Sequence, residues 1–419
     1  MLKDRSRPSS PAPWNGPDTS DDAYNDGYDD HSRDDSDCDQ ESDDGTNNGA
    51  NNDAYSPCLQ LRFDHSRKNE EGFVLGTSRN CDIVLPKRNT LAGLAPRQCV
   101  ITFDVHGRLI LRDLQPRKLN NSGGTAVTYK DQGGQRRRSF TWILSGHRFT
   151  AANVPIRIHL HDNLSFRVVV CQHDISSVWY QQNVALFRSR FASSVNSVSL
   201  GGLGLKSLDS TAAPSGAQTP GTDAILLKDR ELGRGAQAVV ARVWDASTAI
   251  EYATKEPLRQ HFHERLKREI RLLRHINHDC VVRCIPELSM MEPVPRLVLE
   301  YIPLGSLEDQ DEENQISIHE TFEVLRQGLS ALRHLHERET PIVHRDIKPS
   351  NILVQSRTPV IHIKLSDFGF SGENEDYLKT CCGTPLYTAP EVFRGEPYNA
   401  AVDIWSLGVV VFQYAYGLP

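Results

Sequence analysis

Three short motifs in the last fifth of the chain constrain its fold and its chemistry more than any other feature. They are the runs His344–Asn351 (HRDIKPSN), Asp367–Gly369 (DFG) and Ala389–Glu391 (APE). The first run brings an aspartate, a lysine and an asparagine close together, and the second adds another aspartate after an apolar, strand-like stretch. Phosphoryl transfer requires a base-like carboxylate, an ammonium that reaches phosphate and oxygen ligands for metal ions. The order and spacing of these residues therefore predict a phosphoryl-transfer site.

The composition of the chain limits the classes of protein that it can belong to. Its 419 residues, 38% hydrophobic and 24% charged, suit two or three domains with real cores. The net charge of the whole chain is −7, and residues 1–56 alone have a net charge of −11. The remaining residues therefore have a net charge of only about +4, which is no basic excess of the kind that binds nucleic acid. No apolar stretch reaches the roughly 20 residues of a membrane span, and no signal-peptide pattern opens the chain. We expect an intracellular protein, nuclear or cytoplasmic, with neither nucleic acid nor membrane as a direct partner.

The nine cysteines are scattered and odd in number, which fits reduced thiols better than a disulfide framework. The cluster of His275, His278, Cys280 and Cys284 has no second ligand pair at a usual zinc spacing. We interpret this cluster as a loop after a helix.

Four regions follow one another along the chain. Residues 1–56 are rich in Asp, Ser, Asn and Gly and nearly free of aliphatic side chains, which is typical of an acidic disordered tail. Residues 57–178 alternate short apolar runs with turn residues, and residues 179–222 are a linker with a short helix near Val184–Phe191. Residues 223–419 contain the three motifs. The expected fold class is multidomain, with an all-β sandwich before an α+β domain.

The second region has the pattern of a β-sandwich. Leu59–Phe63, Cys99–Phe103 and Arg108–Leu111 are expected as strands, because they are alternating or apolar and are divided by Gly, Asn and Pro turns. Four further segments follow in the order Gly76–Ser78, Cys81–Pro86, Asp113-Leu114 and Asn121–Thr125. In that order they resemble a forkhead-associated (FHA) domain, a sandwich whose loops bind phosphothreonine.

The phosphate-binding positions of the FHA family are occupied differently in this chain. The family has an Arg, a Ser, a His and an Asn at the positions that are here Thr77, Ala95, Gln98 and Gly123. Phosphate prefers charged donors, above all a bidentate Arg, so these replacements remove much of the expected affinity. Basic residues nearby that could substitute are Arg79, Lys87, Arg88 and Arg97. Two interpretations stay open: a module that binds a phosphothreonine protein, and a sandwich used for docking or for packing within the chain.

The fourth region opens with a glycine-bearing turn between two expected strands. Leu232, Gly233 and Gly235 lead into this turn, where backbone without Cβ atoms can approach phosphate groups closely. Val240 follows as an apolar cover for an adenine ring. Two glycines alone are weak evidence, since most such pairs only form a hairpin turn.

A lysine and a glutamate follow at the distances that a nucleotide site needs. Ala253 and Lys255 lie on the next strand-like run, and a helix over Phe262–His275 carries Glu269 as a partner for Lys255. The apolar run Arg296–Ile302 then predicts a buried strand that continues into a connector.

With these elements in this order, residues 225–419 resemble a eukaryotic protein kinase, which has an α+β fold of two lobes. The resemblance implies ATP and Mg²⁺ as cofactors, with Asp346 accepting or orienting the substrate hydroxyl proton and Lys348 steadying the γ-phosphate. Asn351 and Asp367 would hold the magnesium ions. Nucleotide-binding roles are implied for Leu232, Gly233, Gly235, Val240, Ala253, Lys255, Glu269, Glu300, Ile302 and Leu353, with the backbone of Glu300 and Ile302 facing the adenine edge.

Lys348 and Gly383–Pro385 are similar to the serine/threonine branch of the kinase family, which implies protein substrates with Ser or Thr acceptors. Thr384 is expected to contact Asp346 or Lys348. Arg345 indicates a positive pocket for a phosphorylated activation loop. The candidate phosphorylation sites in that loop are Thr380, Ser371 and Tyr377, in that order of preference.

The apolar run Ala400–Tyr416 resembles the central buried helix of the large kinase lobe, with Asp403 tied to the backbone of the HRD loop. The family continues with more helices that cover this one, so the resemblance implies a large lobe that is incomplete at its C-terminus. An FHA domain ahead of a Ser/Thr kinase looks like the checkpoint kinase family. Three functions stay open: an active kinase, an ATP-binding fragment that is inactive or unstable, and an adaptor.

Overall fold

The structure, a computed structural model, describes residues 59–62, 64–116, 123–150, 154–171, 174–189, 224–371 and 384–417. Residues from Leu61 to Pro419 form one compact unit. The predicted acidic tail at residues 1–56 and most of the predicted linker lie outside the described residues. None of the described helices is long and apolar enough to cross a membrane.

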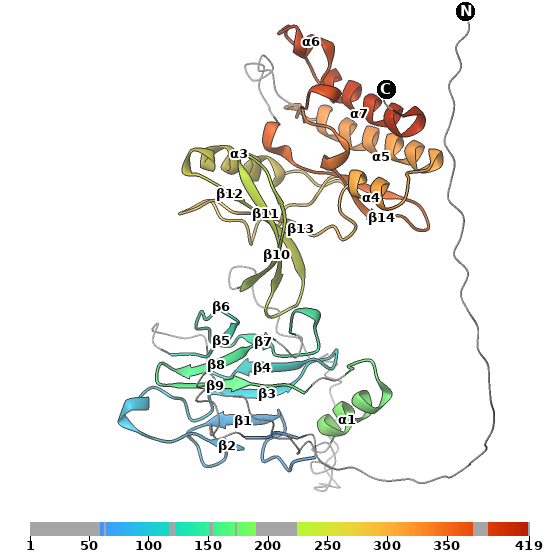
Figure 1. The fold of residues 1–419 in the computed structure, drawn as a ribbon. Helices are drawn as coiled ribbons and strands as arrows, with labels where there is room; N and C mark the ends of the chain where they lie inside the picture. The colour runs from blue at the N-terminus through green and yellow to red at the C-terminus, as the bar shows by residue number, and fades with distance from the viewer. Residues whose placement is uncertain are drawn as a thin grey trace, which may run out of the picture. The chain divides into compact units, whose positions relative to one another are not determined.

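The strands before residue 170 form two β-sheets with one hydrophobic core between them (Figure 1). The strand orders are β2-β1-β3-β4-β7 in one sheet and β6-β5-β8-β9 in the other. Neighbouring strands are antiparallel except β1 and β2, which pair in parallel. The strands are β1 (Phe73–Gly76), β2 (Ile83–Val84), β3 (Cys99–Phe103), β4 (Leu109–Asp113), β5 (Ala126–Tyr129), β6 (Gln132–Gly133), β7 (Thr141–Ile143), β8 (Ile156–His161) and β9 (Leu164–Val168).

Alternating apolar residues build the core of this β-sandwich. Leu111 and Trp142 from one sheet and Val127 and Ile158 from the other are almost completely buried in a single cluster. Because successive side chains of a strand point to opposite faces, each sheet contributes every second residue to that cluster. The inner faces of both sheets are therefore closed against water.

Two of the three strands predicted by example are present, and one is not. β3 coincides with the predicted strand Cys99–Phe103, and β4 begins one residue later than the predicted run Arg108–Leu111. The strand predicted at Leu59–Phe63 is wrong over its described residues, which belong to no sheet and leave Leu59 65% exposed. Alternation alone does not make a strand where no neighbouring strand supplies hydrogen bonds.

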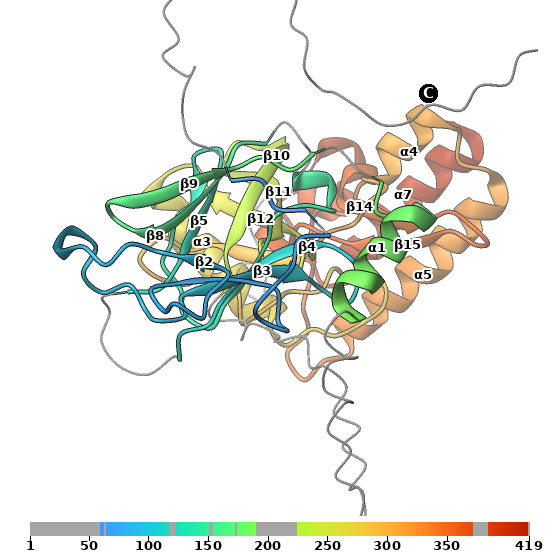
Figure 2. The same ribbon diagram turned by 90° about the horizontal axis from the view of Figure 1, so that it is seen from below.

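Helix α1 (Val178–Ser189) packs against the β-sandwich (Figures 1 and 2). Its buried residue Phe187 contacts two rings of the five-stranded sheet, with centroid distances of 5.3 Å to Phe103 and 5.6 Å to Phe73. The hydroxyl of Tyr180 donates to Gly107 O at 2.8 Å. The helix expected near Val184–Phe191 thus starts earlier than predicted. Because it packs on the sandwich, residues 178–189 belong to the sandwich and are not part of a free linker.

The residues after 223 form a four-stranded sheet with one helix, followed by a mainly helical part (Figure 1). The sheet is antiparallel, in the order β10-β11-β12-β13, and β14 and β15 form a separate pair. The strands are β10 (Leu226–Arg234), β11 (Ala238–Asp245), β12 (Glu251–Pro257), β13 (Leu297–Glu300), β14 (Ile352–Ser356) and β15 (His362–Leu365). The helices are α3 (His263–Leu273), α4 (Leu307–Glu313), α5 (Ile318–His336), α6 (Pro390–Phe393) and α7 (Ala401–Tyr416).

Local sequence signals explain where the helices of this part begin and how closely they pack. Ser306 caps α4 and Ser317 caps α5, each in a capping box with the acidic residue three positions later. Helices α5 and α7 lie side by side in both ribbon views (Figures 1 and 2). A Cβ atom at Gly328 of α5 would come within 2.9 Å of the Leu407 side chain on α7, so a larger residue there would require Leu407 to move.

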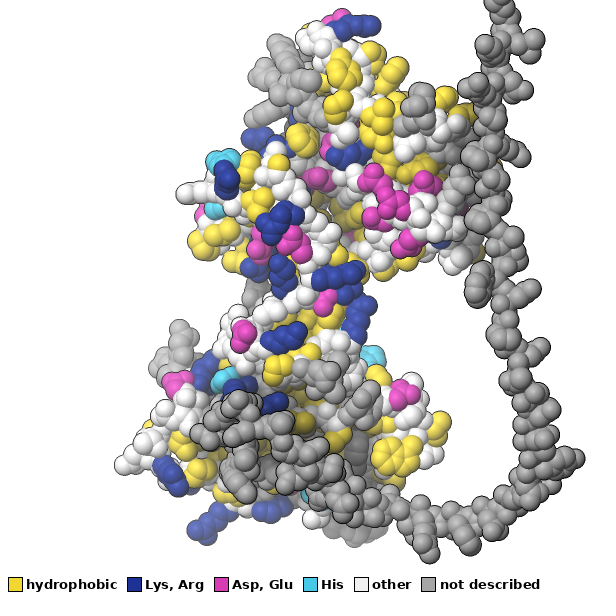
Figure 3. All heavy atoms as spheres, in the orientation of Figure 1, with side chains coloured by type: hydrophobic (Ala, Val, Ile, Leu, Met, Phe, Trp, Pro, Cys, Tyr) yellow, Lys and Arg dark blue, Asp and Glu magenta, His cyan; other side chains and the backbone are white. Residues whose placement is uncertain are grey.

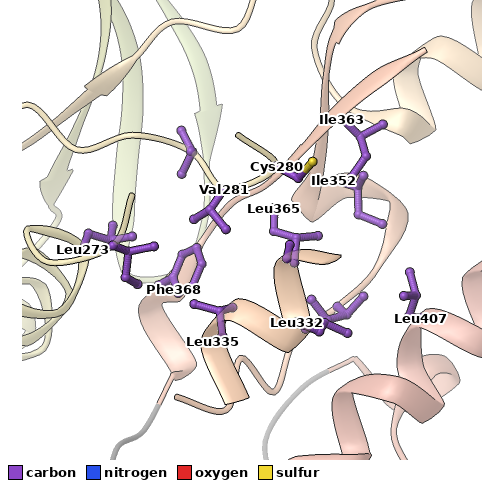
Figure 4. Packing of buried hydrophobic residues seen from close by; sticks show 14 of the residues in the cluster. Leu273, Cys280, Val281, Leu332, Leu335, Ile352, Ile363, Leu365, Phe368 and Leu407 are labelled. Atoms are coloured by element: carbon purple, nitrogen blue, oxygen red, sulfur yellow. The ribbon is translucent and has the colours of Figure 1, made fainter. Parts of the chain in front are cut away.

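One hydrophobic cluster connects the sheet, the β14–β15 pair and the helices (Figure 4). Phe368 of the DFG motif lies in it, 1% exposed, close to Leu335 of α5 and Leu273 of α3 in the close-up view. The side chain that precedes the DFG glycine is therefore fixed from both sides, and this positions Asp367 at the edge of the cluster.

The outer face of α7 is apolar and exposed to solvent. Ile404, Trp405, Phe412 and Tyr416 are between 43% and 80% exposed, and hydrophobic side chains gather over the region of α6 and α7 in the space-filling view (Figure 3). Most soluble surfaces carry only small apolar patches. These four side chains form an exposed apolar surface, the kind of surface to which other proteins can bind.

Candidate active site

A lysine held by two carboxylates forms the first half of the candidate site. Lys255 Nζ on β12 lies 2.8 Å from both carboxylate oxygens of Glu269 on α3 and 2.6 Å from Asp367 Oδ1. Burial lowers the pKa of Lys255, but the two carboxylates outweigh it and the net shift of that pKa is upward. The ammonium in turn holds the pKa of Asp367 at about 2. Lys255 therefore stays protonated, and side chains from two other elements fix its direction.

The second half of the site is a group of polar side chains around a buried carboxylate. Asp346, 5% exposed, accepts a hydrogen bond from Asn351 Nδ2 at 2.9 Å on Oδ2, and the same oxygen lies 3.1 Å from Lys348 Nζ. The hydroxyl of Thr384 donates to Asp346 Oδ1 at 3.2 Å and accepts from Lys348 Nζ at 2.9 Å. The prediction that Thr384 contacts Asp346 or Lys348 is confirmed for both residues.

The backbone before Asp346 is anchored by one completely buried carboxylate. Asp403 on α7 accepts from His344 N at 2.8 Å and from Arg345 N at 2.7 Å. His336, at the end of α5, places its Nε2 2.8 Å from the same carboxylate. The contact predicted between Asp403 and the HRD loop is present, and it joins α5, the loop and α7 at one point.

Two residues of the site have the left-handed backbone conformation that non-glycine residues rarely adopt. Arg345 has a φ of 69° and Asp367 a φ of 59°. Such conformations cost about 1–3 kcal/mol each and persist where the surroundings hold them. Here Asp403 holds the first, and the contact between Asp367 Oδ1 and Lys255 holds the second. Arg345 directly precedes Asp346, and Asp367 is itself one of the two predicted metal-binding residues.

The glycine-bearing turn connects β10 and β11, and its glycines have no structural need to be glycine. Among the described residues, no atom lies within 4 Å of a Cβ atom placed on Gly233, and a Cβ atom on Gly235 would have an ordinary 3.9 Å contact with Ala238 O. Leu232, 40% exposed, precedes the turn, and Val240 pairs with Gly233 on one side and with Lys255 on the other. The described part of the fold thus leaves room for a side chain at Gly233, and a backbone without a Cβ atom there permits close approach by another molecule.

The connector after β13 supplies the positions predicted to face an adenine ring. Ala253 is the register partner of Leu299, which places both beside the start of the connector. Glu300 already donates its N–H to Arg283 O at 3.0 Å, so its carbonyl is the group that it can offer to a nucleotide. Ile302 is 5% exposed, and Leu353 on β14 is half-buried and bridged to the start of α4.

The oxygen atoms near Asp346 and Asp367 fit a magnesium ion that is shared with phosphate groups. Asn351 uses its amide nitrogen for Asp346, with bonds of 2.8 Å to the backbone carbonyl and 2.9 Å to the carboxylate, which leaves its Oδ1 for a metal. Among the described residues no group of three His, Cys, Asp or Glu side chains could hold a metal by itself. Mg²⁺ usually takes one or two protein ligands and completes its shell with phosphate and water. Asn351 and Asp367 suit that arrangement.

Comparison with known proteins agrees with this geometry. Residues 226–419 match the family model described as the protein kinase domain. This segment has the fold of a protein kinase domain. The match begins at the first residue of β10. The four-stranded sheet with α3 therefore corresponds to the small lobe of the kinase fold, and the helical part to the large lobe.

The relatives of the kinase domain are protein kinases of several organisms. Calcium/calmodulin-dependent protein kinase type IV of Homo sapiens is 35% identical over 187 residues, which cover 44% of this chain and 39% of that protein. Calcium/calmodulin-dependent protein kinase type 1 of Macrobrachium nipponense is 36% identical over 204 residues, which cover 47% of this chain and 58% of that protein. The ovarian-specific serine/threonine-protein kinase Lok of Drosophila melanogaster is 33% identical over 206 residues, which cover 45% of this chain and 43% of that protein. The chain spans less than two thirds of the length of each of them.

Two residues of the kinase domain that sequence analysis missed support the site. Arg265 on α3 donates from Nε to Gly369 O at 2.7 Å, and its guanidinium carbon lies 4.0 Å from the ring centroid of Phe370. Arg265 is four positions before Glu269, so both lie on one face of the helix, and this spacing was the available signal. His336 beside Asp403 had no comparable signal, because a histidine at the end of a helix is usually exposed.

The activation loop of the kinase domain is described only in part. Thr380 and Tyr377, two of the predicted phosphorylation sites, lie outside the described residues. Ser371 is 5% exposed, and its hydroxyl donates to His344 O at 3.4 Å. A buried hydroxyl is not accessible to another kinase, which argues against Ser371 as a phosphorylation site.

The loops of the β-sandwich use their unusual residues internally. Gln98 is 1% exposed, accepts from Ala95 N at 3.0 Å and lies 3.3 Å from Thr125 Oγ1. Thr77 donates its N–H to Ala95 O at 3.1 Å. A Cβ atom at Gly123 would lie only 2.7 Å from a guanidinium nitrogen of Arg138. Arg138 therefore occupies the space that a side chain at position 123 would fill. The proposed substitutes Arg79, Lys87, Arg88 and Arg97 are all exposed, and Arg97 pairs with Glu71 at 3.3 Å.

Proposed function

We propose that the chain is an ATP-dependent serine/threonine protein kinase that transfers the γ-phosphate of ATP to hydroxyl groups of proteins. The observation that carries the proposal is the hydroxyl of Thr384, which interacts with Lys348 Nζ and Asp346 Oδ1 together. An aliphatic hydroxyl fits between the carboxylate and the ammonium. A Ser or Thr of a protein substrate has the same group and would find the same two partners.

Each residue of the site has a defined part in this reaction. Asp346 orients the acceptor hydroxyl and takes up its proton, and Lys348 balances the negative charge on the phosphate being transferred. Lys255, directed by Glu269, binds the other phosphate groups. Mg²⁺ held by Asn351 and Asp367 would neutralise charge on the phosphate oxygens.

Phosphate transfer to a basic model protein tests the proposal directly. Replacing Asp346 with Asn keeps the size and removes the base, so we expect the initial rate with labelled ATP to fall about 10²–10⁴-fold. Asp279→Asn is a matched control, because Asp279 is exposed on the loop after α3 and far in the sequence from the motifs. Equal rates in the parent and Asp346→Asn, or no transfer by the parent, would reject the proposal.

An ATP-binding adaptor without turnover is the alternative, and the exposed apolar face of α7 is the observation that favours it. Such a protein would be stabilised thermally by Mg-ATP yet transfer no phosphate. Replacing Lys255 with Met should abolish that stabilisation in either case, because the main phosphate contact is lost. Thermal stabilisation together with measurable transfer excludes the alternative.

We further propose that the β-sandwich is an FHA-like module that binds phosphothreonine weakly, with Arg138 as its cation. The support is the position of that guanidinium in the loop where the FHA family uses an Asn side chain. Titrating a phosphothreonine peptide against the full chain, with its unphosphorylated twin as control, tests this. Arg138→Ala should weaken binding about tenfold or more, as expected for a charged hydrogen bond. No difference between the two peptides would leave the sandwich without this function.

The order of a sandwich before a kinase domain supports a more specific proposal, a role like that of the checkpoint kinase family. In such a role the phosphothreonine protein would be a partner inside the cell, and its binding would direct the kinase to its protein substrates. If so, a phosphothreonine peptide should raise the rate of transfer to a substrate fused to the same peptide. The same rate with and without phosphothreonine would count against it.

A further inference from the structure

The small lobe of the kinase domain shares a hydrophobic core with the β-sandwich, inside the compact unit that starts at Leu61. Leu227 of β10 and Trp244 of β11 are at most 3% exposed, as are Ile225, which precedes β10, and Ala246, which follows β11. All four belong to the same buried cluster as Trp142 of β7 and the other core residues of the sandwich. The open end of the β10–β11 hairpin is therefore buried by the sandwich.

Aromatic contacts make this junction specific. The ring of Trp244 stacks on Phe149 at 5.3 Å with an interplanar angle of 19°, and meets Tyr129 edge-on at 5.4 Å and 80°. Next to it, Ile143 N of β7 donates to Ala246 O at 2.9 Å. Aromatic pairs of this geometry add stabilisation beyond the area that they bury. The sandwich thus presents a fitted aromatic site for one tryptophan of the small lobe.

A glutamine side chain makes the same pair of hydrogen bonds that a neighbouring strand would make. Gln132 of β6 donates from Nε2 to Lys228 O at 2.8 Å and accepts from Lys228 N at 2.7 Å on Oε1. Strand β10 is at the edge of its sheet, so the N–H and C=O groups on its outer side have no neighbouring strand of that sheet to bond with. Lys228 lies beside a register irregularity in the pairing of β10 with β11, so Gln132 binds β10 next to an interruption of that pairing.

The hairpin connects this junction to the glycine-bearing turn. Leu226 pairs with Asp245 at the sandwich end, and Gly233 pairs with Val240 at the other end, beside Lys255. We propose that the sandwich is the docking partner of the β10–β11 hairpin, and that this docking restricts the glycine turn and so strengthens nucleotide binding. The second clause rests on the proposed function; the first does not. The sandwich then acts on the ATP site without any phosphopeptide.

The partner in this docking is the chain's own small lobe. Polar contacts surround the apolar centre: Arg148 pairs with Glu251, and Arg108 Nη1 donates to Thr248 O at 3.2 Å. The first contact is an ion pair, and the second supplies a donor to a backbone carbonyl group. Polar contacts around an apolar centre are typical of protein interfaces. A second copy could supply the same hairpin by exchange, and that outcome is distinguishable by mass.

Hydrogen exchange on the full chain tests the docking. Gln132→Ala removes the acceptor of the Lys228 N–H, and we expect exchange at residues 226–231 to rise about tenfold, the factor that corresponds to one net hydrogen bond. Gln135→Ala is the matched control, since Gln135 is an exposed glutamine three positions away. Phe149→Leu, which removes the ring stacked on Trp244, should raise exchange at the end of β11. Unchanged exchange in both variants would overturn the docking.

Nucleotide binding tests the second clause separately. The dissociation constant of Mg-ATP for Gln132→Ala should rise about threefold or more, with no change for Gln135→Ala. Faster exchange with an unchanged dissociation constant would overturn the link to the ATP site. If the parent binds no Mg-ATP, the proposed function fails while the exchange result still decides the docking. A dimer whose protection of β10 disappears on dilution would overturn the assignment to the same chain.

Discussion

Asp403→Asn is the substitution whose effect follows most directly from the geometry. The carboxylate is fully buried and accepts from His344 N, Arg345 N and His336 at 2.7–2.8 Å. Asparagine keeps one oxygen and turns the other into a donor, so at best Arg345 N loses its partner and faces a second N–H group. A charged hydrogen bond is worth about 1.5–3 kcal/mol, and the two remaining bonds weaken by about half when the charge is lost. We expect a loss of about 3–6 kcal/mol in the free energy of unfolding.

Urea unfolding of the full chain measures this loss, and phosphate transfer measures its consequence at Asp346, which follows Arg345 directly. The strained backbone at Arg345 depends on Asp403, so the rate should fall even at temperatures where the variant is folded. Asp279→Asn again controls for the change of charge at an exposed site. A loss below about 1 kcal/mol with an unchanged transfer rate would refute the view that Asp403 organises the HRD loop.

Three more predictions concern other residues of the kinase domain. Hydrogen bonds from Arg357 hold the pKa of Glu320 at about 2 in the folded protein, below its ordinary value of 4.5. The ionised Glu320 therefore stabilises the folded state at pH values above 4.5, and this stabilisation is lost as the pH falls toward 2. Unfolding free energies from pH 7 to pH 2 should therefore differ between the parent and Glu320→Gln by about 1–2 kcal/mol at neutral pH and converge in acid, whereas a constant difference would contradict this. Arg265→Ala should lower kcat more than it raises the KM for ATP, because Arg265 ties α3 to the DFG segment, and Arg271→Ala on the same helix should change neither. Thr380→Ala should lower the transfer rate, and equal rates would count against phosphorylation at Thr380.

The sequence predicted the parts of the site that depend on order along the chain. Lys255 and Glu269 were expected as a pair from their order and distance along the chain, and the structure brings their charged groups to 2.8 Å. The resemblance to kinases added roles for Asp346, Asn351 and Asp367 that periodicity alone does not give. These residues lie in short segments whose local sequence determines their conformation.

Contacts between distant segments could not be predicted in the same way. The bond between Gln132 and Lys228 joins residues 96 positions apart, and an exposed glutamine in a hairpin has no pattern that reveals its partner. The helix α1 was expected in a linker because its composition resembles one, yet three of its residues are buried on the sandwich. Such tertiary contacts depend on how two surfaces fit, which no single stretch of sequence records.

The contact between Lys255 and Asp367 has a further consequence for how ligands would bind. At 2.6 Å the ammonium and the carboxylate neutralise each other, whereas in the proposed function a nucleotide would bind the lysine and a metal ion would bind the aspartate. A phosphate that arrives without metal leaves Asp367 without its counter-charge, and a metal that arrives without phosphate does the same to Lys255. Whichever ligand binds first would thus bear the cost of separating Lys255 from Asp367, and the second ligand would not bear it again. This is positive thermodynamic coupling, so the affinity for the nucleotide should rise in the presence of the metal ion, and the reverse.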